Sequence, residues 1–197
     1  MTGRSASKVV GVGMHRTGTS SLRRAFNILG FRCLEDSGCW FMADIDRHGD
    51  IIFRSTADLD LYQAYADNPV PLFFRELDEM FPGSKFILTH RDVEEWADSV
   101  EHIFAAWRDS WRSLPEGPLI AACHKALYGI DGFDRDRGKR AYRRHHEAVR
   151  DHFKNRPGDL LELDMTRGVE WDAICRFLQT PVPAAPFPRL NTRVDVS

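Results

Sequence analysis

Two short groups of residues in this chain have the types and spacing that suit the binding of anions. The first is the loop Gly13–Ser21, which follows a β-branched run and opens an amphipathic segment. It has the spacing G-x-x-x-x-G-x-[ST] of phosphate-binding loops, but Thr19 stands where such loops carry lysine, and a cation, Arg16, lies inside the loop. Glycine lets the backbone approach an anion closely, and the first amides and the dipole of a following helix attract it. The loop therefore predicts a site for a phosphate or sulfate ester that is handled differently from ATP in an ATPase.

The second group follows the apolar stretch 85–89. Arg91 comes directly after that stretch, and Ser99 lies eight residues further on, in a segment with helical spacing. Eight residues are roughly two helical turns, or about 10 Å along the axis. A guanidinium and a hydroxyl so placed could hold a second phosphate from two sides. In the alternative interpretation, Arg91 forms an ion pair with Glu94 or Glu95 and Ser99 is a surface residue.

A strand before each group and a helix after it must position these residues. After the first loop, a helix is predicted by apolar residues at helical spacing, which are Leu22, Ala25, Phe26 and Leu29. Further strands are expected at 32–34, 85–89 and 160–163, and further helices at 39–47, 72–81, 92–107, 139–153 and 171–178. Alternating strands and helices predict an α/β fold of three layers, α/β/α, around a central, mostly parallel sheet. Ligands bind such sheets at the carboxyl ends of the strands, where both groups lie.

The length of 197 residues predicts one domain over 1–197. Within it, 108–138 carries Pro115, Pro118 and several glycines, and we expect an irregular insertion or lid there. The formal net charge of -2 argues against general nucleic-acid binding. No apolar run reaches the ~18 residues that would span a bilayer, and the polar N-terminus shows no signal peptide. We therefore expect a cytoplasmic protein without a membrane span.

The cysteines predict neither a metal site nor a disulfide framework. The chain has four of them, Cys33, Cys39, Cys123 and Cys175, and their spacing matches no zinc pattern. A cytoplasmic setting also disfavours structural disulfides. We expect buried thiols and no metal ligands.

Both groups resemble motifs of the P-loop sulfotransferases. The stretch 13–21 is similar to their 5′-phosphosulfate-binding loop, and the stretch 85–99 is similar to their 3′-phosphate-binding strand and helix, with its Arg and Ser eight residues apart. The resemblance continues through Asp67-Asn-Pro69 and a C-terminal segment from Trp171 to Pro188, so that it covers most of the chain. It implies the P-loop fold and a sulfotransferase activity.

The resemblance also implies the cofactor, 3′-phosphoadenosine-5′-phosphosulfate (PAPS), and the residues that bind it. By this similarity the 5′-phosphosulfate is held by the loop residues Met14, His15, Arg16, Thr17, Gly18, Thr19, Ser20 and Ser21. The 3′-phosphate is held by Arg91 and Ser99, and Arg167-Gly168 resembles a further loop near that phosphate. Many members of the family carry lysine at the position of Arg16. Arginine provides a rigid, permanently charged fork where lysine provides a point charge.

Transfer of a sulfuryl group explains why the lysine of an ATPase can be absent. A sulfuryl group carries less negative charge than a phosphoryl group, so that fixed donors, Arg16 among them, suffice without magnesium. The acceptor, a hydroxyl or amine of a small molecule, attacks sulfur in line and needs a base. Asp67 is the first candidate, and a turn residue before Pro69 is the equally weighted alternative for it. Asp58 and Asp60 are weaker candidates.

Two other functions fit parts of the sequence. Leu160–Asp164 could imitate the acidic strand of a P-loop kinase or nucleotide hydrolase, although the missing lysine at position 19 opposes this. A non-catalytic protein that binds a bisphosphate nucleotide is the other alternative. The sequence does not identify the acceptor or the oligomeric state. Aromatic residues in or near 108–138 could line an acceptor pocket or belong to the core; these are Trp107, Trp111, Tyr128 and Phe133.

Overall fold

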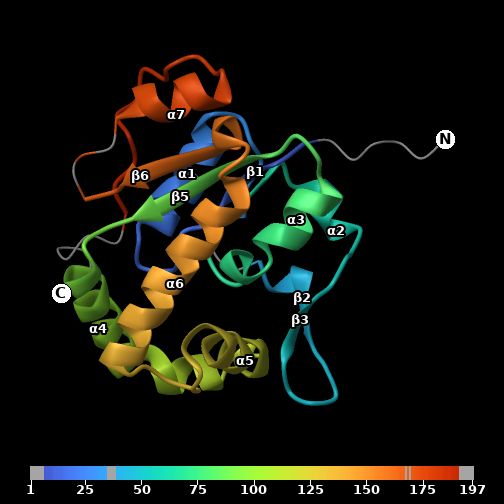
Figure 1. Ribbon diagram of the computed structural model, residues 1–197, viewed down its shortest axis with the longest axis vertical. Coiled ribbons are helices and arrows are strands. Elements are labelled where there is room, and N and C mark those ends of the chain that lie inside the picture. Colours follow the sequence, from blue (N-terminus) through green and yellow to red (C-terminus); the bar gives the residue numbers. More distant parts are fainter. Residues whose placement is uncertain (1–6, 35–38, 167, 169, 191–197) are drawn as a thin grey trace.

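A parallel sheet forms the centre of the described chain. The computed structural model describes residues 7–34, 39–166, 168 and 170–190. The strands of this sheet, in spatial order, are β4 (Ala64–Tyr65), β1 (Val9–Gly11), β5 (Lys85–His90) and β6 (Leu160–Asp164), and all neighbouring pairs are parallel. Figure 1 shows β1, β5 and β6 at the centre of the molecule. Because β1 and β5 are parallel neighbours, the loops that follow them lie at the same edge of the sheet.

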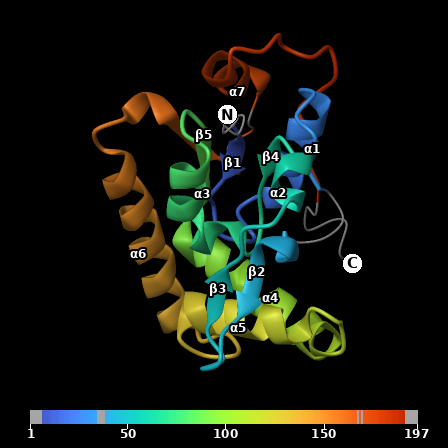
Figure 2. The ribbon, with the colours of Figure 1, turned by 90° about the vertical axis from the view of Figure 1, so that its right-hand side faces the viewer.

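Helices cover both faces of the sheet. On one face lie α1 (Thr19–Ile28) and α7 (Trp171–Leu178), and on the other lie α3 (Phe74–Met80) and α6 (Arg135–Phe153). Figure 2 shows the sheet between α1 and α6. Side chains of β5 alternate accordingly: Ile87 joins the core with α1, whereas Phe86 and Leu88 join the core with α3. The predicted three-layer α/β/α fold is confirmed.

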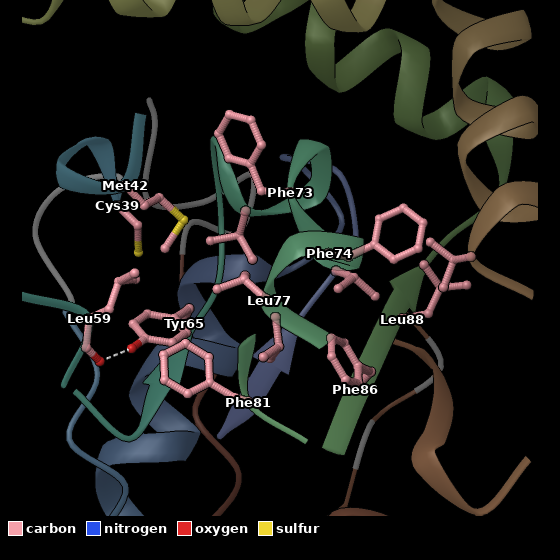
Figure 3. Packing of buried hydrophobic residues seen from close by; sticks show 14 of the residues in the cluster. Cys39, Met42, Leu59, Tyr65, Phe73, Phe74, Leu77, Phe81, Phe86 and Leu88 are labelled. Carbon is pink, nitrogen blue, oxygen red and sulfur yellow. Dashed lines mark hydrogen bonds between the residues drawn. The ribbon is translucent and has the colours of Figure 1, made fainter. Parts of the chain in front are cut away.

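The core between the sheet and α3 is rich in aromatic side chains (Figure 3). Phe74 and Leu77 of α3 are fully buried or nearly so, as is Phe86 of β5. The ring of Phe86 also packs against Phe153 of α6, with ring centroids 4.6 Å apart. Each buried side chain of this size contributes about 1.5–3 kcal/mol relative to exposure. This packing therefore holds α3 and α6 against the strand that leads to Arg91.

Two long helices lie beyond the carboxyl end of β5. They are α4 (Val93–Arg112) and α5 (Gly117–Tyr128), which Figures 1 and 2 both show below the sheet. The Asp92 carboxylate caps α4 by accepting hydrogen bonds from the amides of Glu94, at 2.9 Å, and Glu95, at 3.1 Å. An antiparallel hairpin of β2 (Ala43–Ile45) and β3 (Ile51–Phe53) contacts α5, and a short helix α2 (Asp58–Leu61) precedes β4.

The prediction of an irregular segment at 108–138 is wrong. This segment contains the end of α4, all of α5 and the start of α6. Pro118 lies in the first turn of α5, where a missing amide costs nothing, and Gly129 ends α5 in a left-handed conformation, with φ of 79°. The proline and the glycine therefore mark the two ends of a helix.

Two shorter predictions also fail. The helix expected at 39–47 is a 3-10 turn at Trp40–Met42 followed by β2. Here the Asp46 side chain accepts hydrogen bonds from the amides of His48 and Asp50, at 2.8 and 2.9 Å, and so forms a hairpin turn that favours a strand before it. The strand expected at 32–34 is reduced to one bridge, between Cys33 and Ala64.

In the described part of the chain, no helix combines the length and the apolar character that crossing a membrane requires.

Candidate functional site

A cleft of about 940 Å³ opens at the carboxyl ends of the strands. This volume is at the upper end of the range for small-molecule sites, roughly 300–1,000 Å³, so the cleft has room for a large ligand or for two. One part, which we call the loop end, is lined by the segment 16–21 together with Arg91 and Ser99. The opposite part, the helix end, is lined by side chains of α4, α5 and their connection: Ile103, Trp111, Leu114, Ile120 and His124. The structure thus brings most predicted donor residues to one end of one cleft.

The backbone of the loop has the shape of an anion cradle. Arg16 and Gly18 have left-handed conformations, with φ of 65° and 92°. A Cβ atom on Gly13 would lie 2.0 Å from Oγ1 of Thr89, so this position needs glycine because β1 and β5 approach closely there. The Thr17 hydroxyl closes the turn by donating to the Met14 carbonyl oxygen at 2.6 Å, and it lies 2.7 Å from the Thr89 hydroxyl.

Helix α1 begins directly after this turn. Its first amides have no acceptors within the helix, and the helix dipole adds positive potential at the same point. Thr19, Ser20 and Ser21 line the cleft here. The Ser21 hydroxyl also accepts a hydrogen bond from the amide of Leu190 at 2.9 Å. The start of α1 is therefore a polar surface suited to anionic oxygens.

Two arginines meet beside the loop. The Nε atom of Arg16 donates to the Ser99 hydroxyl at 2.9 Å, and Nη1 of Arg91 lies 3.5 Å from the Arg16 carbonyl oxygen. Burial, and then the positive charge of Arg91, lower the pKa of Arg16 from its usual value, while the charge of Asp67 raises it in part. Two cations so close are stabilised by an anion between them.

Arg91 forms the ion pair of the alternative interpretation and also lines the cleft. Its Nη2 atom donates to Glu95 at 3.0 Å in the ion pair expected from the alternative interpretation, and its side chain also lines the cleft. Its buried Nε atom has no hydrogen-bond partner among the described residues. A buried donor without a partner is costly, so this atom is suited to an anionic ligand oxygen. The loop end therefore fits a ligand with more than one anionic group.

Helix α6 holds the backbone on both sides of the cradle. The Tyr142 hydroxyl accepts a hydrogen bond from the amide of Arg91 at 3.0 Å and donates one to the Arg91 carbonyl oxygen at 2.9 Å. Three residues later, Nε2 of His145 donates to the Val12 carbonyl oxygen at 2.7 Å. The sequence analysis predicted only a helix over 139–153, and helical spacing gives no sign of these polar contacts. They were missed for that reason.

Met14 and His15 differ in their relation to the cleft, since only His15 of these two lines it. The Met14 side chain is fully buried in the core around Trp96, and Met14 does not line the cleft. The indole of Trp96 donates to the His15 carbonyl oxygen at 3.0 Å, and Nε2 of His15 is hydrogen-bonded to the Tyr128 hydroxyl. Burial, followed by the charge of Arg16, lowers the pKa of His15 to about 3, so this imidazole is neutral.

Asp67 is both a turn residue and a carboxylate in the cleft. It has a left-handed backbone, with φ of 73°, and its Oδ1 accepts a hydrogen bond from the amide of Asn68 at 2.9 Å. Its Oδ2 lies 3.7 Å from Nη2 of the buried Arg23, and both side chains line the cleft. Asp58 and Asp60 are exposed on α2 and do not line it.

The aromatic residues proposed for an acceptor pocket separate in the structure. Trp111 lines the helix end of the cleft, whereas Trp107 is 50% exposed outside it. Tyr128 is buried against His15, and Phe133 packs against Trp96 with ring centroids 5.8 Å apart. Only Trp111 among these four therefore faces the cleft.

The C-terminal segment completes the loop end. Phe187–Leu190, Met165 and Thr166 line the cleft beside the start of α1. The sequence analysis included Phe187 and Pro188 in the resemblance to the family but assigned neither of them to the site. Gly168 has a left-handed backbone, with φ of 77°, and lies close to Arg189. Arg167, which the sequence analysis paired with it, lies outside the described residues.

Comparison with known proteins gives two matches. Residues 8–196 match a family model described as a sulfotransferase domain. The chain is also 31% identical over 216 residues to "Ava biosynthesis cluster protein M" from Aspergillus versicolor, in a match that covers 94% of this chain and 81% of that protein. Among the described residues, no group of three or more His, Cys, Asp or Glu side chains is arranged to hold a metal ion.

Proposed function

This chain belongs to the sulfotransferase family, and we propose that it transfers a sulfuryl group from PAPS to a hydroxyl or amine of a small acceptor molecule. The observation that carries the proposal is the pair of anion-binding features in one cleft. The cradle at the start of α1 and the side chains of Arg91 and Ser99 are joined by the hydrogen bond from Arg16 to Ser99, at 2.9 Å. A nucleotide with phosphates on both its 3′ and 5′ positions needs two such features.

Each feature has a role in this proposal. The loop residues from Arg16 to Ser21 hold the 5′-phosphosulfate through amides, hydroxyls and the Arg16 guanidinium. Arg91 and Ser99 hold the 3′-phosphate, which gives the buried Nε of Arg91 an acceptor. When bound, PAPS supplies the sulfuryl group, and the group that leaves sulfur is 3′,5′-bisphosphoadenosine, which departs through an oxygen of its 5′-phosphate. Arg16 and the amides of α1 stabilise the negative charge that develops there.

The acceptor is activated by Asp67 in this proposal. Its carboxylate lines the cleft, and the Arg23 guanidinium, 3.7 Å away, orients it. It takes the proton of the acceptor hydroxyl or amine as the acceptor oxygen or nitrogen bonds to sulfur. Asp58 and Asp60 are not part of the proposal, because neither lines the cleft.

The proposal treats 1–197 as one domain that acts in the cytoplasm without a metal cofactor. All four cysteine thiols are buried, which suits a compartment that keeps thiols reduced.

The test compares three nucleotides by their effect on the melting temperature and by calorimetry. These are 3′,5′-bisphosphoadenosine (PAP), adenosine 5′-monophosphate (AMP) and ATP with magnesium. The proposal predicts that PAP without metal stabilises the protein most. Arg91→Ala should weaken PAP about 10–100-fold, because charge-assisted hydrogen bonds contribute about 1.5–3 kcal/mol, and should leave AMP unchanged. Arg112→Ala, an exposed arginine paired with Asp131, is the control.

Other outcomes would identify another function. Preferential stabilisation by ATP with magnesium would favour a kinase or hydrolase. Tight PAP binding, with no sulfate transferred from labelled PAPS to any compound of an acceptor panel, would favour a non-catalytic nucleotide-binding protein. An equal loss of PAP and AMP affinity in Arg91→Ala would contradict the assignment of Arg91 to the 3′-phosphate.

A further inference from the structure

A buried histidine faces the helix end of the cleft without a protein partner. His124 of α5 is 4% exposed and lines the cleft, yet its imidazole makes no hydrogen bond with any described residue. Its neighbour His15, at 6.0 Å between ring centroids, differs in this respect because it is bonded to Tyr128. His124 therefore carries an unused hydrogen-bonding capacity next to the loop.

Aromatic rings hold His124 in place. Its ring centroid lies 4.6 Å from that of Phe104, 5.5 Å from that of Trp111 and 6.1 Å from that of Tyr128. Burial, followed by the charge repulsion of His15, lowers its pKa to about 3, so the ring is neutral. A neutral imidazole has one N–H donor and one acceptor nitrogen. The ring is thus a fixed, uncharged hydrogen-bonding group.

The walls around His124 are apolar. Ile103 and Trp111 come from α4, Ile120 comes from α5 and Leu114 from the turn between these helices. Four arginines line the cleft. Arg16 and Arg91 lie at the loop end, Arg189 belongs to the C-terminal segment that completes the loop end, and Arg23 lies beside Asp67. Glu116, two residues after Leu114, also lines the cleft, and its side chain is acidic. Apolar walls and an acidic neighbour disfavour an anionic ligand.

We propose that the helix end binds the acceptor, that this acceptor is an uncharged molecule with a ring and a hydroxyl group, and that His124 positions it by donating its N–H to the hydroxyl oxygen. This inference rests on the proposed function. The hydroxyl proton remains free to go to Asp67, so His124 is a positioning residue and takes no proton. An ammonium group cannot accept this hydrogen bond and would lose its hydration against the apolar walls, and a carboxylate meets no cation at this end.

The first test measures binding of 2-naphthol to the protein, with and without saturating PAP, by calorimetry and tryptophan fluorescence. Two analogues of the same ring system serve as comparisons, 2-naphthoate as the anion and 2-(aminomethyl)naphthalene as the cation. We expect 2-naphthol to bind at least about 10-fold more tightly than either. Equal or tighter binding of a charged analogue, or no binding of 2-naphthol, would overturn the inference.

The second test isolates the hydrogen bond. His124→Phe keeps the ring and its packing but removes the N–H, and should weaken 2-naphthol about 5-fold while leaving naphthalene, which has no hydroxyl, unchanged. PAP affinity should also stay unchanged. The control is His102→Phe, at an exposed position of α4. Equal losses for naphthol and naphthalene would show that His124 acts only by packing, and would overturn its positioning role.

The third test adds a charge to the wall. Leu114 and Leu61 are exposed to similar extents, 47% and 49%, but only Leu114 lines the cleft. Leu114→Asp should weaken 2-naphthol at least about 5-fold and Leu61→Asp should not change it, since a carboxylate disfavours apolar burial. Similar effects of both variants would place naphthol elsewhere.

The same measurements separate this inference from the proposed function. A protein that binds PAP but not 2-naphthol would overturn the inference alone. A protein that binds 2-naphthol but not PAP would overturn the proposed function.

Discussion

At the loop end of the cleft, the groups that face a ligand come mainly from one short segment, whereas at the helix end they are side chains from two helices. The loop end depends on backbone shape: left-handed residues at Arg16 and Gly18, and a close approach at Gly13. The helix end depends on which side chains α4 and α5 present, and on His124 in particular. Local backbone conformation therefore forms the loop end, whereas tertiary packing of side chains forms the helix end. Substitutions should therefore affect the two ends differently.

The largest effect is expected from Gly13→Ala at the loop end. Its Cβ would lie 2.0 Å from Oγ1 and 2.5 Å from the carbonyl oxygen of Thr89, so that the loop must move. We expect PAP affinity to fall more than about 100-fold, because several charge-assisted hydrogen bonds of about 1.5–3 kcal/mol each are lost. Calorimetry measures this, and the 2-naphthol site should persist.

Gly158→Ala is the control for this variant, since a Cβ there meets nothing within 4 Å. If Gly13→Ala retained PAP affinity, the loop end would not depend on backbone shape, and the contrast between the two ends would be lost.

The next effect is expected between the two ends, at Asp67→Asn. Loss of the proposed base should lower kcat by roughly 100-fold or more, as is common for general bases, while PAP affinity changes by less than about 3-fold. Initial rates with labelled PAPS and 2-naphthol measure kcat and KM separately. Asp58→Asn, at an exposed carboxylate outside the cleft, is the matched control. An unchanged kcat would leave Asp67 with its turn role only.

Acid should weaken the fold through three buried histidines, of which His15 and His124 line the cleft. The pKa values of His15, His124 and His146 are lowered to about 3 in the folded chain, mainly by burial, from 6.5. Between these values the unfolded chain binds more protons, so the free energy of unfolding falls as pH drops below 6.5. The slope is at most about 1.4 kcal/mol per pH unit for each histidine.

Urea unfolding between pH 7.5 and 4.5 measures this slope. His124→Phe should reduce it by the contribution of one proton, and the exposed-site variant His102→Phe should not. An unchanged slope in His124→Phe would mean that the His124 ring at the helix end is not buried in its neutral form.

The smallest effect is expected from Tyr142→Phe, which acts on the loop end from behind. It removes both hydrogen bonds to the Arg91 backbone, at 3.0 and 2.9 Å. PAP affinity should fall about 5-fold, the value of roughly one hydrogen bond, and AMP affinity should not change. Calorimetry measures both, with Tyr62→Phe outside the cleft as the control. An equal loss for both nucleotides would show that α6 acts on the whole loop end.

The fold and the loop end were predictable because their signals are local. Apolar spacing predicted the helix after Gly18 and the strand at 85–89, and parallel order follows from alternating strands and helices. The helical structure of 108–138 was not predictable, because prolines and glycines at the ends of helices resemble those of loops. His124 and Tyr142 were missed for a further reason. Their partners, or the lack of them, arise only when α5 and α6 pack against distant parts of the chain.

Helix α6 has a thermodynamic consequence for nucleotide binding. Tyr142 holds the backbone of Arg91 and His145 holds that of Val12, three residues apart on one helix face. The loop after Val12 and the segment that begins at Arg91 must be held at a fixed distance to bind one nucleotide. Both are already ordered against α6. Binding then loses little conformational entropy in the protein, and the amides of Val12 and Arg91 should exchange with solvent deuterium at similarly slow rates before and after the nucleotide is added.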